Sequence, residues 1–130
     1  MLIIIVYNRT TPTKFDIDSE LIWIQKNVVA TVYNPIKEQT DSHYWITANM
    51  SVIDTINPLK HRWIAVSRDL EEFFPLGTEV EILNAGIYSG IWTINDRMNR
   101  RFKNRIDFLI GENDKKGYWN GVVIRYKPNI

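Results

Sequence analysis

Two aspartates, Asp96 and Asp107, enclose a strongly basic part of the chain. The stretch TINDRMNRRFKNRID, residues 93–107, holds between them Arg97, Arg100, Arg101, Lys103 and Arg105. Such a run of cations is typical of a surface that grips phosphates or carboxylates, whereas a pair of carboxyl groups indicates acid/base chemistry. The simpler interpretation is that Asp96 caps the turn that follows it and that Asp107 pairs with a neighbouring arginine, because aspartates are common where strands end.

The overall charge argues against nucleic acid as the partner of this basic run. The chain has 16 Lys and Arg against 15 Asp and Glu, which leaves a net charge of +1. Domains that bind nucleic acid usually carry a basic excess over a whole face. We therefore expect no nucleic-acid partner.

Composition also excludes several kinds of site. The chain contains no cysteine, which rules out a disulfide framework, a Cys-ligated zinc site and a thiol nucleophile. His43 and His61 are the only histidines, and with scattered acids they make no ligand set, since a metal site needs three or more convergent ligands. We predict no metal site.

Length and hydropathy indicate a single domain. The 130 residues, 45% hydrophobic and 24% charged, are enough for one globular core. The apolar run 2–7 lacks the positive region and the cleavage site of a signal peptide, and no stretch approaches the roughly 18 apolar residues of a membrane span. We expect no membrane span, a buried strand at 2–7, and a protein that acts where it is made or is released other than by secretion.

Apolar residues recur with period two, which predicts short strands. The predicted strands cover 2–7, 21–24, 28–33, 78–83, 90–94, 106–110 and 122–126. Residues 67–74 predict one short helix, with Ser67 as its N-cap and Pro75 at its end. Many short strands in one small domain indicate a barrel or a sandwich, and the long irregular region 34–62 is expected to carry function.

Alternation along these strands predicts where the two carboxyls lie. Asp96 shares a face with Trp92 and Ile94, and Asp107 shares a face with Arg105. Both aspartates stand at strand ends beside bulky apolar residues. Such surroundings raise the pKa of a carboxyl group and suit it to proton transfer.

A series of short motifs gives the chain a resemblance to a known family. The motifs are VVATVYNP (28–35), EQTD (38–41), WITANM (45–50), RWIAVSRDL (62–70), FPLGTEVEI (74–82), GIWTIND (90–96) and KNRIDFLIG (103–111). In this order they resemble the three-aspartate (3D) domain of the membrane-bound lytic transglycosylase A family and of stationary-phase survival proteins. The resemblance covers residues 28–126 and leaves 1–27 as an N-terminal extension of one domain spanning 1–130. It implies a mainly β fold, a six-stranded double-psi β-barrel with one to three short helices.

The resemblance also implies an activity on peptidoglycan glycan strands. Lytic transglycosylases cleave the MurNAc–GlcNAc bond and form a 1,6-anhydro ring, with no metal or organic cofactor. Asp96 and Asp107 match the second and third family aspartates, and Asp107 is the expected acid/base. One carboxyl suffices because the nucleophile is the sugar's own 6-hydroxyl. We expect Asp96 to tune the pKa of Asp107 by like-charge repulsion.

Three departures from the family pattern bear on catalysis. Ser67 stands where the first family aspartate is expected, with Asp69 as the candidate substitute. Residues 97–102 replace a Gly-Gly stretch, and Asn49-Met50 replace Ser-Gly. These departures favour a rival hypothesis, a non-catalytic glycan-binding or structural module in a larger assembly. A third hypothesis is a hydrolase of similar fold that acts on another polysaccharide.

The predicted substrate-binding residues are Asp41, Tyr44, Trp45, Thr47, Asp69 and Arg105. The rings of Tyr44 and Trp45 offer platforms for the apolar faces of sugars. The cations of 97–105 either bind lactyl and peptide carboxylates in bidentate fashion or form a solvated loop. We expect Asp41, Thr47 and Asp69 to converge with the two catalytic aspartates on one groove. Without a signal peptide, a phage or virion-associated lysin fits best, and the sequence leaves oligomeric state open.

Overall fold

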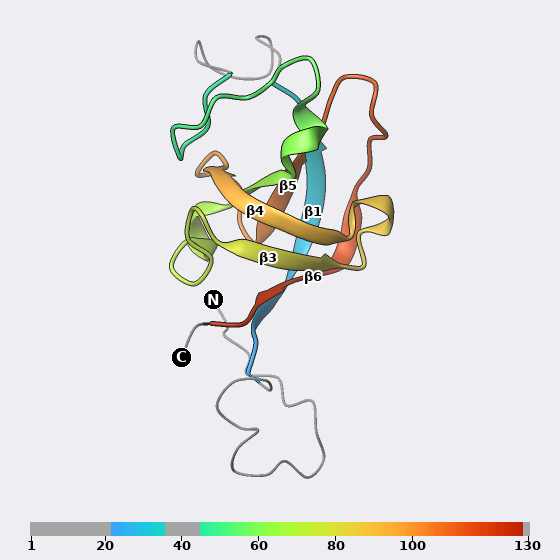
Figure 1. Cartoon of the computed structure of the whole chain (residues 1–130). Helices are drawn as coiled ribbons and strands as arrows, with labels where there is room; N and C mark the ends of the chain where they lie inside the picture. The colour runs from blue at the N-terminus through green and yellow to red at the C-terminus, as the bar shows by residue number, and fades with distance from the viewer. Residues whose placement is uncertain (1–21, 36–44, 129–130) are drawn as a thin grey trace.

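A computed structural model describes residues 22–35 and 45–128 (Figure 1). The strand predicted at 2–7 and the site residues Asp41 and Tyr44 lie outside the described residues. No helix within the described ranges has the length and apolar character needed to cross a bilayer.

The described chain folds as a closed six-stranded barrel, as predicted. The strands are β1 (Ile24–Tyr33), β2 (Trp63–Val66), β3 (Glu79–Leu83), β4 (Gly90–Arg97), β5 (Arg105–Leu109) and β6 (Trp119–Tyr126). Around the barrel they follow the order β1-β5-β2-β4-β3-β6, and β6 closes on β1. Figure 1 shows β3 and β4 side by side in front of β1. The helical elements are short 3-10 turns, η1 (Pro58–His61), η2 (Arg68–Leu70) and η3 (Gly86–Tyr88).

The strand order has an internal two-fold symmetry. Two pairs are parallel, β1 with β5 and β2 with β4, and the other neighbours are antiparallel. The strands correspond as β1 to β4, β2 to β5 and β3 to β6. Exchanging each strand with its counterpart turns the parallel pair β1–β5 into the parallel pair β4–β2. It also turns the pair β3–β4 into the pair β6–β1. The two halves interlock, as a double-psi barrel requires.

Aromatic rings fill one part of the barrel core. Phe108 is fully buried, with its ring centroid 4.7 Å from that of Trp92, 5.4 Å from Tyr88 and 5.9 Å from Trp119. The indole N–H of Trp92 donates a hydrogen bond of 2.7 Å to the carbonyl of Tyr88, so this buried donor is satisfied. The rings come from η3, β4, β5 and β6, and their packing ties these elements together.

Several elements differ from the prediction, among them β2 (Trp63–Val66), which was not predicted. The strand predicted at 28–33 begins earlier, at Ile24, because its pairing with β6 continues through Asn27. Of the strand predicted at 21–24, only Ile24 lies in β1, since residues 22–23 belong to no strand and residue 21 lies outside the described residues. The predicted helix at 67–74 is shorter, a 3-10 turn over Arg68–Leu70 followed by further turns. Ser67 occupies the N-cap position without a capping hydrogen bond from its side chain, since its hydroxyl is used elsewhere.

Candidate functional site

Asp96 reaches the outer face of the barrel through a β-bulge. Ile94 and Asp96 pair with consecutive residues of β2, so Asn95 is an extra residue in β4. Paired residues of adjacent strands point to the same face, and one extra residue reverses the alternation. The prediction that Asp96 shares a face with Trp92 and Ile94 is therefore wrong. The bulge turns Asp96 away from the core into which these two residues pack.

The strand register places both aspartates on the same face. Ala65 of β2 pairs with Asp96 on one side and with Asp107 on the other. Asp107 in turn pairs with Thr31 of β1. Thr31, Asp107, Ala65 and Asp96 thus form a row across the four neighbouring strands β1, β5, β2 and β4. The smallest side chain of this row, that of Ala65, lies between the two carboxyls. Since Ala65 carries only a methyl group, no bulky side chain of β2 separates Asp96 from Asp107.

Two residues of β1 contact the carboxyls. The Thr31 hydroxyl donates a hydrogen bond to Asp107 Oδ1 and accepts one of 3.0 Å from the Arg105 Nε–H. The Tyr33 hydroxyl donates to Asp96 Oδ2 over 3.4 Å. Thr31 and Tyr33 are two residues apart in a strand and therefore share a face. Neither hydroxyl was predicted as part of the site, although the alternation of polar residues in VVATVYNP was the signal that pointed to them.

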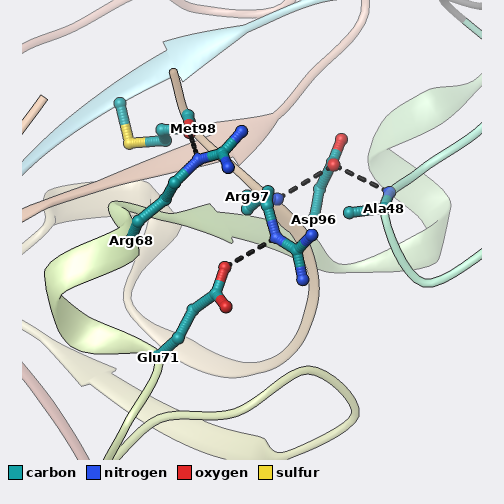
Figure 2. A network of polar contacts seen from close by, with 6 residues as sticks. All are labelled: Ala48, Arg68, Glu71, Asp96, Arg97 and Met98. Atoms are coloured by element: carbon teal, nitrogen blue, oxygen red, sulfur yellow. Dashed lines mark hydrogen bonds and ion pairs between the residues drawn. The ribbon is translucent and has the colours of Figure 1, made fainter. Parts of the chain in front are cut away.

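Main-chain groups hold Asp96 from two further directions. Its Oδ1 accepts hydrogen bonds of 2.9 Å from the N–H of Ala48 and of 2.9 Å from the N–H of Arg97 (Figure 2). The Arg97 side chain turns toward Glu71, with 2.7 Å between Nε and Oε1. Arg97 is thus engaged within the protein. Because Arg97 is the last residue of β4, the bond from its N–H to Asp96 lies within the strand and is not the predicted cap of a following turn.

Burial is the largest influence on the Asp107 carboxyl. It raises the pKa of Asp107 above the ordinary value, against the hydrogen bond from Thr31 and the charge of Arg105, which both lower it. We had expected like-charge repulsion from Asp96 to raise this pKa, but the structural cause is removal from water. Asp107 therefore holds its proton to higher pH than an exposed aspartate, as a general acid must.

The other two titratable groups of the site are also shifted by burial. Burial raises the pKa of Asp96, opposed by the N–H groups of Ala48 and Arg97 and by the Tyr33 hydroxyl. The pKa of Tyr33 lies well above its ordinary value, because of burial first and the charges of Asp96 and Asp107 next. Tyr33 is therefore a neutral hydrogen-bond donor throughout the neutral pH range, and it lies within electrostatic reach of both carboxyls.

The turn at 45–53 brings the Ala48 N–H to the site. Thr47 is almost completely buried, and its Oγ1 accepts a hydrogen bond of 3.1 Å from the Ser51 N–H. Asn49 binds the bulge through two hydrogen bonds. Its N–H donates to the Asn95 carbonyl at 3.2 Å, and its Nδ2 donates to Asn95 Oδ1 at 2.9 Å. The predicted substrate contact Thr47 thus shapes the turn that supports Asp96. In Figure 1 this part of the chain lies over one end of the barrel.

Ser67 and Asp69 hold the start of β5. Ser67 is fully buried, its N–H donates to the Arg105 carbonyl at 2.8 Å, and its Oγ accepts from the Arg105 N–H at 3.0 Å. Asp69 Oδ2 accepts from the Asn104 N–H at 3.0 Å. In the described part of the chain, no hydrogen bond or ion pair joins Asp69 to Asp96 or Asp107. Both residues therefore support the strand that carries Asp107 and do not meet the carboxyl pair directly.

Ser67→Ala is expected to lower the free energy of unfolding by about 1–3 kcal/mol, because it leaves the Arg105 N–H buried without an acceptor. Urea unfolding measures this loss. The matched control is Thr55→Ala, which removes a hydroxyl from an exposed residue and should change stability by less than about 0.5 kcal/mol. Equal unfolding midpoints for Ser67→Ala and the wild type would show that this hydrogen bond does not stabilise the fold.

The remaining predicted site residues lie at the edges of this cluster. The Arg105 guanidinium bonds Thr31 and packs over the Phe102 ring at 4.7 Å. Trp45 is 38% exposed and starts the turn that supports Asp96. Of the cations between β4 and β5, Arg100, Arg101 and Lys103 are exposed. Within residues 22–35 and 45–128, no three His, Asp or Glu side chains gather in a way that would hold a metal ion.

Comparison with known proteins does not assign this site to a family. No model of a known protein family matches the chain, and no curated protein matches it. The function is therefore argued from the carboxyl pair and its surroundings.

Proposed function

We propose that the protein is a lytic transglycosylase that cleaves the MurNAc–GlcNAc bond of peptidoglycan, with Asp107 as its single acid/base. One observation carries the proposal. Asp107 is a largely buried carboxyl whose pKa is raised by burial, and a second carboxyl, Asp96, stands in the same row of the same face. A proton donor paired with a second carboxylate suits a reaction in which positive charge develops on a sugar ring.

The reaction balances with these two groups and the substrate alone. Protonated Asp107 gives its proton to the glycosidic oxygen, and the bond from that oxygen to C1 of MurNAc breaks with both electrons going to the oxygen. Asp107, now ionised, takes the proton of the MurNAc 6-hydroxyl as that oxygen forms its bond to C1. Asp107 ends protonated, as it began, and no water is consumed. Ionised Asp96 stabilises the positive charge that develops at C1.

The exposed cations supply a means of binding the rest of the substrate. Arg100, Arg101 and Lys103 lie in the segment that joins β4, with Asp96, to β5, with Asp107. Peptidoglycan carries lactyl and peptide carboxylates, and arginine binds a carboxylate through two parallel hydrogen bonds. The proposed setting is that of a phage or virion-associated lysin.

Digestion of purified sacculi tests this function. Because no water enters the products, soluble muropeptides should carry 1,6-anhydro ends and be about 18 Da lighter than their hydrolysed counterparts, as expected when one carboxyl replaces the usual hydrolytic pair. Mass spectrometry of the soluble fraction measures this. Products with reducing ends would instead identify a hydrolase, with Asp96 as the candidate base for water.

A second candidate is a non-catalytic glycan-binding or structural module of the same fold. The observation in its favour is that Ser67 and Asp69, at and near the place of the first family aspartate, bind the backbone at the start of β5. Sacculi that retain the protein without releasing any soluble product would support this candidate against the enzyme.

A further inference from the structure

Strand β1 presents one hydroxyl group to each carboxyl of the pair. The Thr31 hydroxyl bonds Asp107 Oδ1, and the Tyr33 hydroxyl bonds Asp96 Oδ2 at 3.4 Å. Within the described residues, no hydrogen bond joins Thr31 to Asp96 or Tyr33 to Asp107. The alternation of β1 places both hydroxyls on the same face, two residues apart. Each of them therefore contacts a different aspartate.

The Thr31 contact orients Asp107. A hydroxyl has one proton to donate and lone pairs with which to accept. Thr31 accepts from the Arg105 Nε–H at 3.0 Å, so its own proton is directed to Asp107 Oδ1. Among the described residues, Asp107 Oδ2 has no hydrogen-bond partner. This second oxygen is the one left to carry a proton to a substrate oxygen.

The Tyr33 contact completes a set of three donors around Asp96. The N–H groups of Ala48 and Arg97 bond its Oδ1 at 2.9 Å each, and Tyr33 bonds its Oδ2. Each donor favours the ionised carboxylate. Asp107 receives one hydrogen bond, from Thr31, and lies near the charge of Arg105, so hydrogen bonds favour the ionised form more strongly at Asp96 than at Asp107.

We propose, on the basis of the proposed function, that Thr31 and Tyr33 are positioning residues that give the two aspartates different roles. Tyr33 holds Asp96 as the charged carboxylate, and Thr31 orients Asp107 as the proton donor. Within residues 22–35 and 45–128, the charged and titratable groups that face the pair are Tyr33 of β1, Arg97 of β4 and Arg105 of β5, with Glu71 beyond Arg97.

The test follows each carboxyl separately in Tyr33→Phe and Thr31→Val. Carboxyl carbon NMR titration of the full chain should show the pKa of Asp96 rising in Tyr33→Phe while that of Asp107 changes less, and the opposite in Thr31→Val. Thr31→Ser keeps a hydroxyl and should keep the wild-type titration. Thr31→Ala replaces the valine variant if that variant does not fold.

Turnover on sacculi gives the second readout. Activity needs ionised Asp96 and protonated Asp107. Removal of the Tyr33 hydroxyl should raise the pKa of Asp96 and so move the acid side of the pH profile to higher pH. Removal of the Thr31 hydroxyl should raise the pKa of Asp107 and so move the alkaline side to higher pH. Each variant should lower kcat about tenfold to a hundredfold, with KM nearly unchanged. Tyr33→Phe removes a hydrogen bond to ionised Asp96, and Thr31→Val removes the bond that orients protonated Asp107 and stabilises the carboxylate left when its proton is transferred. The controls Tyr118→Phe and Thr55→Val, at exposed positions, should change neither readout.

The two readouts separate this inference from the proposed function. If the wild-type protein releases no product from sacculi, the proposed function is wrong. The NMR titrations still test whether Tyr33 and Thr31 act on different aspartates. Equal shifts of both carboxyls in each variant, or no shift in either, would overturn the assignment even if turnover is normal.

Discussion

Asp107→Asn is expected to abolish the release of 1,6-anhydro products, with a fall in rate of about 10²–10⁴-fold or more, the range for removal of a general acid/base. The amide can still accept the Thr31 hydrogen bond through its oxygen, so the geometry around Oδ1 is kept while the transferable proton is lost. Rates of product release from sacculi measure the effect. Glu72→Gln, at an exposed carboxyl, is the matched control and should keep full activity.

The same variant should not lose stability at neutral pH. Burial raises the folded-state pKa of Asp107 above its ordinary value of 3.8, so the folded protein binds this proton more tightly than the unfolded chain does. Stability is therefore lost as pH rises from 3.8 through the raised pKa. Above that window the ionised carboxylate destabilises the fold. The asparagine variant should melt at the wild-type temperature or above it at pH 7, whereas this advantage should vanish below pH 3.8. A large drop in melting temperature at pH 7 would make Asp107 a structural residue.

Phe108→Ala is expected to have the largest effect on stability, a loss of about 3–5 kcal/mol in the free energy of unfolding. Phe108 is fully buried, and its ring lies within 6 Å, centroid to centroid, of the rings of Trp92, Tyr88 and Trp119. These large rings come from three other elements and cannot all collapse into the space left by a phenyl group, so a cavity remains.

Urea unfolding at fixed pH measures this loss. Tyr118→Ala provides the contrast, because Tyr118 is 62% exposed and its truncation should cost less than about 0.5 kcal/mol. A loss below about 1 kcal/mol for Phe108→Ala would show that the aromatic cluster rearranges to fill the space and does not act as a rigid part of the core.

The alternation of apolar and polar residues predicted the strands that have one buried face and one more exposed face. β3 and β6 follow the expected pattern of buried and more exposed residues. β2 (Trp63–Val66) was not predicted, because its last three residues are all buried and the run shows no alternation. A strand covered on both faces reads as a continuous apolar segment, which period two cannot detect.

The types of the site residues were predictable, but their placement was not. A bulge has no residue signature, so alternation alone assigned Asp96 to the wrong face. The hydroxyls of Thr31 and Tyr33 lie two residues apart on one side of β1, yet nothing local indicates that two distant carboxyls meet them there. The pairing of Arg97 with Glu71 likewise joins the end of β4 to the residue after η2, a contact between distant segments that a linear pattern does not contain.

The order of the strands has a consequence for how the protein reaches this structure. β1, which carries Thr31 and Tyr33, has β5 and β6 as its neighbours, the last two strands of the described residues. On the ribosome, β1 emerges long before β5 and β6 and cannot form its pairing with either strand until that strand has been made. Closing such long loops makes folding slow, with times in the millisecond to second range typical of barrels dominated by non-local pairing. The carboxyl pair and its hydroxyls can thus assemble only after β5 has been made, and until then the unpaired edge of β1 is open to aggregation.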